Sequence, residues 1–343
     1  MDSALRLDRL DACICVPVYN HGRTVGQVVS EARKYATTVL VCDDGSTDGS
    51  GAKAAEAGGV LLTHPKNQGK GAALGTLFRE ARARGFKYAF TLDADGQHYP
   101  KDVEQLAAVV EKEPGALVVG ARDLVKAGAP GSSEFGRKFS NFWTWLETGQ
   151  HLEDCQTGFR AYPLETLEKL GIVTTHYDYE IEVLVRAGWA GVPLRSAPID
   201  VLYPKDRVTH FNKLRDNARL TLFNWLACMR LFVPWPLGPR LGKVASGPGL
   251  SLFQVRNWLW LGRPGLVSRL LSIGAGAALA ESGSPWAWAV GLAAAASGVG
   301  VFPYLVAFYL TRWALDAGAP AGVVAATAGV LAASLGLFES KRK

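Results

Sequence analysis

The sequence is poor in cysteine, and the cysteines that it has are not spaced as metal ligands. Five occur among 343 residues, and they do not show the paired spacing that is typical of zinc sites. Cys13 and Cys15 lie in an apolar segment that reads as a strand, so we expect buried, reduced thiols there. The start of the chain, from Met1 to Leu10, is charged and lacks the apolar centre of a signal peptide. Together with the odd cysteine count, this favours a cytosolic location for the first part of the chain.

The glycine-rich fingerprint of dinucleotide-binding proteins is also missing. The first predicted strand is followed by Tyr19, Asn20 and His21, where a Rossmann dehydrogenase would have Gly-x-Gly-x-x-Gly. A nucleotidyltransferase would need a glycine-rich loop with Arg or Lys at the same place, and that loop is absent too. The tripeptide Gly-Lys-Gly at 69–71 lacks the spacing and the Ser or Thr of an ATP-binding P-loop. It opens a predicted helix, however, so its N–H groups and Lys70 are placed to face an anion.

Charged residues are missing from two long stretches near the C-terminus. Residues 285–310 contain none, and this stretch is long enough to cross a bilayer of about 30 Å. Residues 317–338 form a second uncharged stretch, which Pro320 interrupts. The shorter stretch 266–280, which carries Arg269, is a third candidate. The sequence therefore predicts C-terminal transmembrane helices.

The charged ends of the chain indicate how these helices are oriented. The final Lys341-Arg342-Lys343 favours a cytoplasmic C-terminus. Because we also expect the N-terminal part in the cytoplasm, an even number of crossings is the simplest arrangement. The sequence thus predicts a multi-pass protein of the inner (cytoplasmic) membrane.

The positive charge of the chain is concentrated just before these stretches. Residues 203–243 contain eight Lys or Arg and two Asp, a surplus that equals the net charge of +6 of the whole chain. Apolar residues recur there every three or four positions, which predicts an amphipathic helix: Phe211, Leu214, Ala218, Leu222, Trp225, Met229 and Phe232. A core helix would show the same spacing. Because Arg215, Arg219 and Arg230 flank the stripe, we favour a helix at an anionic membrane surface, and we expect no nucleic-acid partner.

The first 120 residues alternate short apolar runs with segments of helical spacing. The predicted strands are 12–18, 38–42, 60–63, 88–92 and 116–120, and the predicted helices are 23–35, 47–57, 69–84 and 100–112. Ser46 or Thr47 is the expected cap of the second helix. Repeated β-α units indicate an α/β fold with a mainly parallel, Rossmann-like sheet and helices on both faces. Ligands of such sheets bind beyond the carboxyl ends of the strands, and the polar motifs of this chain fall at those ends.

Two carboxylates follow the fourth predicted strand one residue apart. Asp93 and Asp95 belong to Asp-Ala-Asp-Gly-Gln-His (93–98), directly after the apolar run 88–92. Alternate side chains of an extended segment point the same way, so both acids project together and repel each other unless a cation lies between them. Paired carboxylates with an amide or water oxygen suit Mg²⁺ or Mn²⁺, which also bind diphosphate. An Asp-rich turn without a metal is the alternative.

Five motifs in this order resemble those of the family-2 glycosyltransferases, which have the GT-A fold. Within that family they resemble the polyprenyl-phosphate (dolichyl-phosphate-type) mannosyl and glucosyl synthases. The resemblance covers residues 12–232, and its motifs are Val-Pro-Val-Tyr-Asn (16–20), Val-Cys-Asp-Asp-Gly-Ser-Thr-Asp-Gly (41–49), Asn-Gln-Gly-Lys-Gly (67–71), Asp-Ala-Asp-Gly-Gln-His (93–98) and Gln-Thr-Gly-Phe-Arg-Ala-Tyr (156–162). The C-terminal region resembles a small membrane domain that is fused to some bacterial members.

The resemblance implies a role for each motif. The residues that would bind the nucleotide-sugar are Pro17, Tyr19, Asn20, Asp44, Lys70 and Asp93, the last of which would position the donor. Asp95 and Gln97 would hold the metal, although ligand chemistry alone would also accept His98. The acceptor phosphate would lie near Arg122, Arg137 and Ser140. Arg207 and Lys213 would close over the diphosphate leaving group.

The nature of the acceptor decides whether the reaction needs a base. A lipid monophosphate is largely dianionic near neutral pH, so it needs Arg side chains to hold it in line rather than a strong base. A hydroxyl acceptor would need a base, for which Asp154 is the candidate, and a turn or cap residue is its structural alternative. Glu180, near the start of a predicted helix, has a similar ambiguity, and we favour helix capping over a role in the acceptor site.

These features predict three parts: a cytoplasmic GT-A catalytic domain (1–210), a basic amphipathic membrane-interface segment (211–247) and a C-terminal membrane domain (248–343). The predicted catalytic residues are Asp93, Asp95, Asp154 and Arg207. The expected reaction is inverting, metal-dependent transfer of a hexose from a UDP- or GDP-linked sugar to polyprenyl phosphate at the cytoplasmic membrane face. The first alternative is transfer to a hydroxyl of another membrane acceptor, such as a glycerolipid or a lipid-linked saccharide. A non-enzymatic nucleotide-sugar-binding membrane protein is the second, and the intact donor and metal motifs disfavour it.

Overall fold

The computed structural model describes residues 4–128, 131–202, 213–232, 237–242, 251–254 and 256. The predicted membrane segments 266–280, 285–310 and 317–338 lie outside the described residues, as do Arg207 and the side chain of Lys213. Within the described part, no helix is both long enough and apolar enough to cross a bilayer. The chain divides into two compact units, and the helices and strands named below belong to the first, which comprises residues 1–232 and 236–254.

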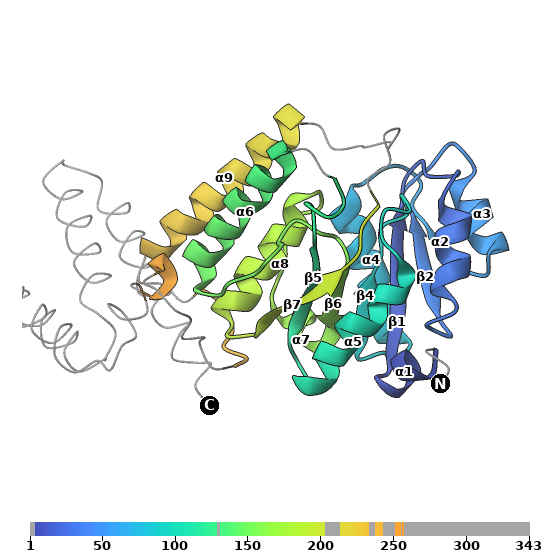
Figure 1. Cartoon of the computed structure of the whole chain (residues 1–343), viewed down its shortest axis with the longest axis horizontal. Coiled ribbons are helices and arrows are strands. Elements are labelled where there is room, and N and C mark those ends of the chain that lie inside the picture. The colour runs from blue at the N-terminus through green and yellow to red at the C-terminus, as the bar shows by residue number, and fades with distance from the viewer. Residues whose placement is uncertain are drawn as a thin grey trace, which may run out of the picture. The chain divides into compact units, whose positions relative to one another are not determined.

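A seven-stranded sheet forms the centre of this first unit (Figure 1). In spatial order its strands are β3 (Val60–Thr63), β2 (Val39–Asp43), β1 (Ala12–Val18), β4 (Tyr88–Thr91), β6 (Arg160–Pro163), β5 (Leu117–Arg122) and β7 (Leu194–Ile199). Neighbouring strands are parallel except for β6, which is antiparallel to both β4 and β5. The prediction of a mainly parallel α/β sheet is therefore confirmed, with one reversed strand inside it.

Helices cover both faces of the sheet, and the alternation of side chains along β1 shows how. Ile14 and Val16 face a core formed with α1 (Ala4–Arg9), α2 (Val25–Ala32), α3 (Ser50–Glu56) and α5 (Val103–Lys112). Cys13 and Cys15 face a second core formed with α4 (Lys70–Ala83), α7 (Leu164–Lys169) and α8 (Asp178–Trp189). Every residue of β1 is buried, as expected for a parallel strand covered on both sides. The predicted burial of the two reduced cysteines is confirmed.

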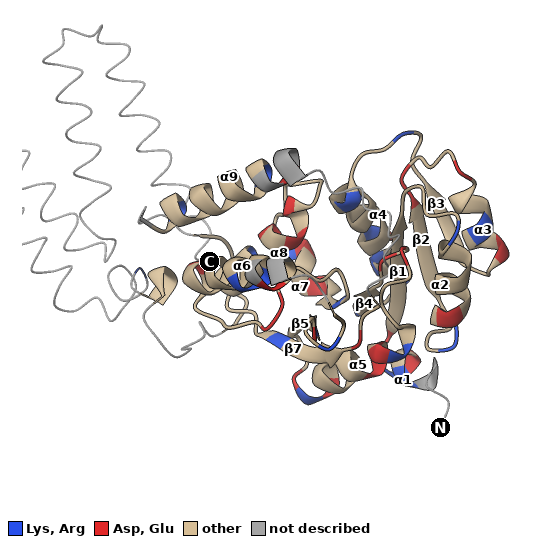
Figure 2. Ribbon diagram, turned by 45° about the horizontal axis from the view of Figure 1, so that its top comes forward, with Lys and Arg blue, Asp and Glu red and all other residues tan. Residues whose placement is uncertain are grey.

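Two long helices, α6 (Gly131–Thr148) and α9 (Lys213–Phe232), lie side by side and both contact α8 (Figures 1 and 2). α9 confirms the helix predicted from the apolar stripe. It packs inward through Ala227, Cys228 and Leu231, whereas Trp225, in the centre of the stripe, is 56% exposed. The described part of the stripe, Ala218 to Met229, is therefore on the outside of the first unit and does not form its core.

Two predictions differ from the structure. α3 begins at Ser50, after Gly49 in the left-handed region with φ 80°, and its first backbone N–H donates to Asp48 Oδ1 at 3.0 Å. The predicted caps were wrong because Ser46 and Thr47 bind the loop after β1 instead. No strand was predicted at β6, since it has only four residues, starts with Arg160 and ends with Pro163. A short 3₁₀ turn (Pro100–Asp102) precedes α5.

Candidate active site

The loops that follow β1 and β2 are tied together at the carboxyl edge of the sheet. Asn20 adopts φ 53°, a conformation that Asn tolerates better than most residues, and its backbone N–H donates to Ser46 Oγ at 2.9 Å. Asn20 Oδ1 accepts a second hydrogen bond, from the backbone N–H of Thr47 at 2.9 Å. Pro17 is buried in β1 beneath this loop, and Tyr19 is partly exposed within it. The structure thus brings the predicted nucleotide-site residues of the first strand next to the turn that holds Asp44.

Asp44 anchors the loop that leads to Lys70. Its carboxylate is almost fully buried, and its oxygens accept from the backbone N–H of Gln68 at 2.9 Å and of Gly69 at 2.8 Å. His64 Nδ1 lies 2.7 Å from Asp44 Oδ1. Sequence reasoning missed His64, because a single histidine in a loop carries no signal of its partner. Asp44 therefore fixes the start of α4 in addition to its place at the predicted nucleotide site.

Three charged side chains from three elements meet at one ammonium group. Lys70, the first residue of α4, places Nζ 2.8 Å from Asp93 Oδ1 and 3.1 Å from Glu180 Oε1. Burial lowers the pKa of Lys70, but the two carboxylates raise it well above its usual value. Burial raises the pKa of Asp93, but Lys70 outweighs this and holds it below its usual value. Lys70 and Asp93 are therefore arranged to stay charged near neutral pH.

Asp95 and Gln97 stand on the loop after β4, where both are partly exposed. Asp95 Oδ1 accepts from the backbone N–H of Gln97 at 2.9 Å, which fixes the turn between them. Within the described part of the chain, no three His, Cys, Asp or Glu side chains form a self-contained metal site. A cation here would take a carboxylate and an amide oxygen from this loop, and its other ligands from water or a bound diphosphate. That donor set fits Mg²⁺ or Mn²⁺.

His98 follows this loop and lies among the charged groups of the site. Its ring is buried 5.6 Å from the ring of Phe159, and its buried Nδ1 has no hydrogen-bond partner in the described region. Burial is the main cause that lowers the pKa of His98 to about 4; Asp93 opposes this shift, and Arg122 and Lys70 contribute to it. The imidazole is therefore neutral near pH 7. Its unpaired Nδ1 is compatible with the alternative assignment of His98 as a metal ligand.

Arg122 and Asp154 form a bidentate ion pair on the other side of the site. Arg122, the last residue of β5, places Nε 2.6 Å and Nη2 3.0 Å from the two oxygens of Asp154. Asp154 is fully buried, and its Oδ1 also accepts from the backbone N–H of Gln156 at 3.0 Å. A general base must reach the proton that it takes, whereas both oxygens of this carboxylate are occupied by donors. The geometry therefore suits a residue that orients Arg122 better than it suits a base.

The remaining predicted acceptor residues lie on α6, next to this ion pair. Arg137 Nη1 donates to the backbone carbonyl of Arg122 at 2.9 Å, and its buried Nε has no hydrogen-bond partner among the described residues. Ser140 Oγ accepts from Gln156 Nε2 at 2.8 Å. Arg122, Arg137 and Ser140 are thus brought into one neighbourhood, as the motifs predict.

Arg160 has a structural function that the sequence did not reveal. It is fully buried at the start of β6, and its guanidinium donates to the backbone carbonyls of Thr157 at 2.7 Å, Glu180 at 2.7 Å and Cys155 at 2.8 Å. Because β6 is antiparallel, its first residue lies at the carboxyl edge of its neighbours. Arg160 therefore joins the loop that contains Asp154 to the first turn of α8.

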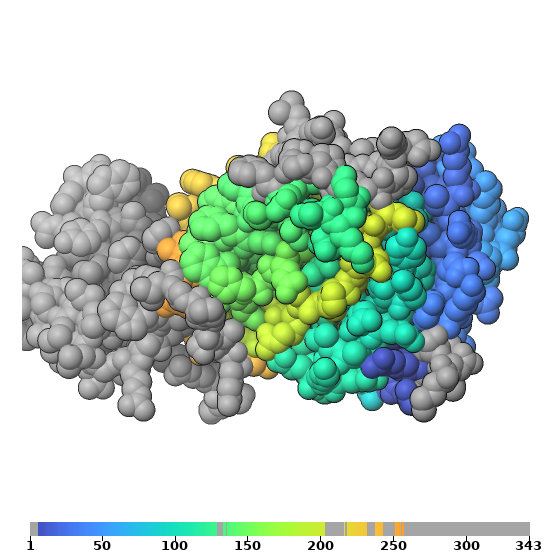
Figure 3. Space-filling view, viewed as in Figure 1, coloured from blue at the N-terminus to red at the C-terminus, as the bar shows by residue number. Residues whose placement is uncertain are grey.

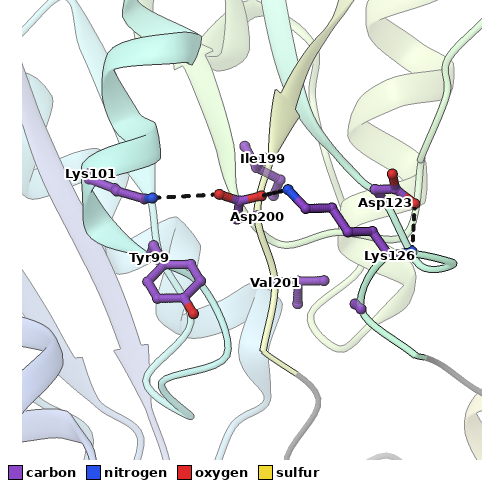
Figure 4. A pocket seen from close by; sticks show the side chains of 8 residues that line it. Tyr99, Lys101, Asp123, Lys126, Ile199, Asp200 and Val201 are labelled. Carbon is purple, nitrogen blue, oxygen red and sulfur yellow. Dashed lines mark hydrogen bonds and ion pairs between the residues drawn. The ribbon is translucent and has the colours of Figure 1, made fainter.

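A pocket of about 330 Å³ adjoins the site (Figure 4), lined by Tyr99, Lys101, Asp123, Lys126, Ala127, Ile199, Asp200 and Val201. Asp200 lies between Lys126 Nζ at 3.1 Å and Lys101 Nζ at 3.5 Å. A single bridge between His98 and Val201 connects this end of β7 to the loop with Gln97. In Figure 3, β7 and the residues after it (yellow) run across the surface between α6 (green) and α5 (teal). None of the predicted site residues that the structure describes lines the pocket.

Apolar side chains are exposed along α6 and α9. On α6, Phe139 and Phe142 are exposed and make edge contacts with the ring of Trp143, at 6.0 and 5.8 Å between centroids. On α9 the exposed apolar residues are Leu222, Trp225, Leu226 and Met229. Figure 2 shows that α9 is uncharged over most of its length. Apolar surface of this kind is typical of a protein or membrane interface.

Comparison with known proteins identifies relatives of this chain. Residues 13–171 match the family model of glycosyl transferase family 2. The chain is 30% identical over 202 residues to polyprenol monophosphomannose synthase of Mycolicibacterium smegmatis, and the alignment covers 54% of this chain and 75% of that one. It is 32% identical over 196 residues to an uncharacterized protein of Methanocaldococcus jannaschii, with coverages of 55% and 81%.

Solved structures share this fold. One of them, glucosyl-3-phosphoglycerate synthase of Mycobacterium tuberculosis in complex with Mn²⁺, UDP and phosphoglyceric acid, is 19% identical. The superposition has a TM-score of 0.50 and covers 72% of this chain and 84% of that one. At this identity the likeness is one of fold, that of the GT-A sheet.

Proposed function

The chain belongs to glycosyltransferase family 2, and from this premise we propose that it transfers a hexose from a UDP- or GDP-linked sugar to a polyprenyl phosphate. A phosphate oxygen of the acceptor forms a bond to the anomeric carbon on the face opposite the donor diphosphate. The bond from that carbon to the diphosphate breaks, and the diphosphate leaves with the electron pair. The configuration at the anomeric carbon is therefore inverted.

The ion pair between Arg122 and Asp154 is the observation that carries this proposal. Asp154, the candidate base, is fully buried, and both of its carboxylate oxygens accept hydrogen bonds. A phosphate nucleophile brings its own negative charge and needs no base. It needs cationic donors, and the buried, unpaired Nε of Arg137 beside Arg122 supplies one. The acceptor side is thus built to hold a phosphate and is poorly built to deprotonate a hydroxyl.

The donor side supports a nucleotide-sugar. In this proposal Pro17, Tyr19, Asn20 and Asp44 hold the nucleoside, with Lys70 close by. Asp93 faces the sugar, and Asp95 and Gln97 hold Mg²⁺ or Mn²⁺. A divalent cation would take up charge on the departing diphosphate, and the relative of the same fold was crystallised with Mn²⁺ and UDP. Arg207 and Lys213 complete the proposal as the cationic pair at the leaving group.

A membrane location at the cytoplasmic face fits the surface of α6 and α9. Arg137 and Ser140 lie on the same helix as the exposed Phe139 and Phe142. A lipid acceptor has an apolar chain next to its phosphate, so apolar surface and phosphate donors on one helix match its chemistry. The exposed stripe of α9 extends this surface, and residues 211–247 would rest on the membrane while residues 248–343 anchor the chain in it.

The alternative acceptor is a hydroxyl of a glycerolipid or lipid-linked saccharide. It would require Asp154 to release Arg122 before it could take a proton, and no arrangement of that kind is present among the described residues. Because the chain is a glycosyltransferase by family, the non-enzymatic alternative is not retained.

The proposal is tested with the purified full-length chain in lipid vesicles. A panel of UDP- and GDP-linked labelled hexoses is offered together with undecaprenyl phosphate or, as the matched control acceptor, undecaprenol. We expect label in the lipid fraction with undecaprenyl phosphate alone, loss of transfer in EDTA, and a product that mild acid cleaves. Equal or better transfer to undecaprenol or to the vesicle glycerolipid, giving an acid-stable product, would overturn the lipid-phosphate assignment and favour the hydroxyl acceptor.

A further inference from the structure

We propose that Glu180 is a positioning residue for the donor, and that it acts through Lys70 on Asp93. The inference rests on the donor site proposed above and extends it to a residue on the acceptor-side half of the chain. Sequence reasoning favours a cap at the start of α8 as the role of Glu180; the residue does lie in the first turn of that helix, but its side chain makes no capping hydrogen bond among the described residues.

The acidic residues at the start of α8 do different things. Asp178 Oδ1 accepts from the backbone N–H of His176 at 3.2 Å, so Asp178 has a contact typical of a cap. Glu182 is a structural carboxylate that accepts from the backbone N–H of Thr174 at 2.8 Å and pairs with Arg186. No backbone N–H of the described residues donates to the side chain of Glu180. Its buried Oε1 has no hydrogen-bond partner among these residues, and it forms an ion pair with Lys70 Nζ at 3.1 Å. The contacts of Glu180 thus point to Lys70.

The position of Lys70 also argues against a purely structural pair. A cation at the first residue of a helix is opposed by the helix dipole, so Lys70 does not stabilise α4 where it stands. It is also largely buried, with 18% of its side chain exposed. The carboxylates of Asp93 and Glu180, at 2.8 and 3.1 Å from Nζ, are the ion-pair partners that offset these costs in the described part of the chain. The position of Lys70 is therefore better explained by its contact with Asp93, the residue proposed to position the donor, than by a role in the stability of α4.

Two glycines make this close arrangement possible. A Cβ at Gly158 would lie 2.5 Å from Asp93 Oδ2 and 2.7 Å from Lys70 Nζ. A Cβ at Gly71 would lie 2.5 Å from the Cβ of Tyr179, next to Glu180. Because both positions are glycine, β4, α4, α8 and the loop before β6 can approach the ammonium group of Lys70 closely. Two consecutive elements, α4 and β4, are thereby joined to α8 and to the loop before β6, which lie much later in the sequence.

The shared ammonium has a consequence for the donor. With Glu180 in place, Lys70 interacts with two carboxylates, so it offsets the negative potential at Asp93 only in part, and Asp93 can still interact with the donor and its cation. Without the carboxylate of Glu180, Lys70 interacts with Asp93 alone. It then offsets more of the negative potential at Asp93 and draws this side chain toward α4. A donor bound through Asp93 would then be misplaced, because small shifts at a reacting centre have large effects on rate.

The test is a double-mutant cycle in the full-length chain, with donor affinity measured by calorimetry with Mn²⁺ and UDP, and with steady-state kinetics. Glu180→Gln keeps the size of the side chain and removes its charge. We expect the Kd for Mn²⁺–UDP and the KM for the nucleotide-sugar to rise at least about fivefold, with the KM for the acceptor changed less than about twofold, and Glu180→Asp to recover part of the loss. In a Lys70→Met background the same substitution should change donor affinity by less than about twofold.

Glu182→Gln is the matched control, because Glu182 is a buried acid of the same helix that contacts no donor residue. It should lower the melting temperature while leaving both KM values near those of the wild type. Unchanged donor binding in Glu180→Gln, or an equal loss in both the wild-type and the Lys70→Met backgrounds, overturns the inference while the proposed function stands. If the wild-type chain itself binds no Mn²⁺–nucleoside diphosphate, the proposed donor site falls and the inference falls with it.

Discussion

Replacing Asp154 by Asn separates the two readings of this carboxylate. The substitution keeps the shape of the side chain and one carbonyl oxygen, but it removes the charge that faces Arg122 at 2.6 and 3.0 Å. Breaking a buried ion pair costs about 3–5 kcal/mol, and the retained carbonyl oxygen places our expectation near the lower end. Typical domains have about 5–15 kcal/mol of stability, so the variant should still fold, with a clearly lower melting temperature.

The kinetic expectation follows from the loss of orientation at Arg122. A guanidinium that is no longer held by two hydrogen bonds should grip the acceptor phosphate poorly, so the KM for undecaprenyl phosphate should rise by about ten- to fiftyfold. The value of kcat at saturating acceptor should fall less than about fivefold, and the shape of its pH profile between pH 6 and 9 should not change. Arg122→Lys should show the same pattern, because an ammonium group cannot bind both oxygens of a carboxylate in a fixed plane.

The Asp154→Asn experiment has a matched control and a result that would refute the positioning role. Asp200→Asn removes a solvent-exposed carboxylate that also bridges two lysines, so it should change neither the acceptor KM nor the melting temperature measurably. If Asp154 is the base, Asp154→Asn instead lowers kcat by about 10²- to 10⁴-fold at unchanged acceptor KM and removes the acid limb of the pH profile. That result would refute the positioning role and would favour the hydroxyl acceptor.

Three further outcomes are expected. Asp95→Ala should lower turnover more than about a hundredfold and abolish Mn²⁺–UDP binding at an unchanged melting temperature, because the metal loses its charged ligand; near-normal activity, or full activity of the wild type in EDTA, contradicts the metal assignment. Arg137→Ala should weaken acceptor binding at least about tenfold while calorimetric donor binding stays unchanged, whereas Lys138→Ala, an exposed neighbour paired only with Glu134 in the described part of the chain, should change neither. Burial raises the pKa of Glu147 from 4.5 to about 9, so the folded state favours the protonated carboxyl. The stability that this group contributes is fully present below about pH 4.5 and is lost as the pH rises toward 9. The loss is at most about 1.4 kcal/mol per pH unit. Glu147→Gln should therefore gain stability over the wild type between pH 5 and pH 8 in thermal unfolding, and parallel pH dependences of the two proteins would show that Glu147 is not the cause.

Local patterns predicted the first half of the fold well, since each strand there is a short apolar run between turn residues. The strands at 12–18 and 60–63 were predicted with their observed ends, and the paired Asp93 and Asp95 were placed correctly at the end of β4. β6 could not be found in this way, because a strand that starts with a buried arginine has no apolar signature. Its pairing depends on Tyr88–Thr91, which lies far earlier in the chain.

The functions of single carboxylates were harder to predict than their positions. Asp154 could be read as a base or a turn residue, and the choice depends on Arg122, 32 residues away in the sequence. Glu180 was read as a cap because acids favour helix N-termini, yet its partner is Lys70 on another helix. Helical spacing likewise gave the apolar stripe of α9 but not its direction, since a stripe is equally consistent with a core and with an exposed face. Such roles depend on tertiary contacts that no local pattern contains.

The reversed strand β6 also sets the order in which the chain can assemble during synthesis. β1 to β4 are complete by Thr91, but β5 pairs only with β6 and β7 and cannot join them directly. The edge of β4 therefore stays open until Pro163 has emerged, roughly seventy residues later, which takes several seconds at about 5–20 residues per second. An open strand edge is a template for pairing with another chain, so we expect nascent or refolding chains to be most prone to misassembly in this interval. The half that contains Asp44 and Lys70 can form early, while the half that contains Arg122 and Arg137 must wait for one four-residue strand.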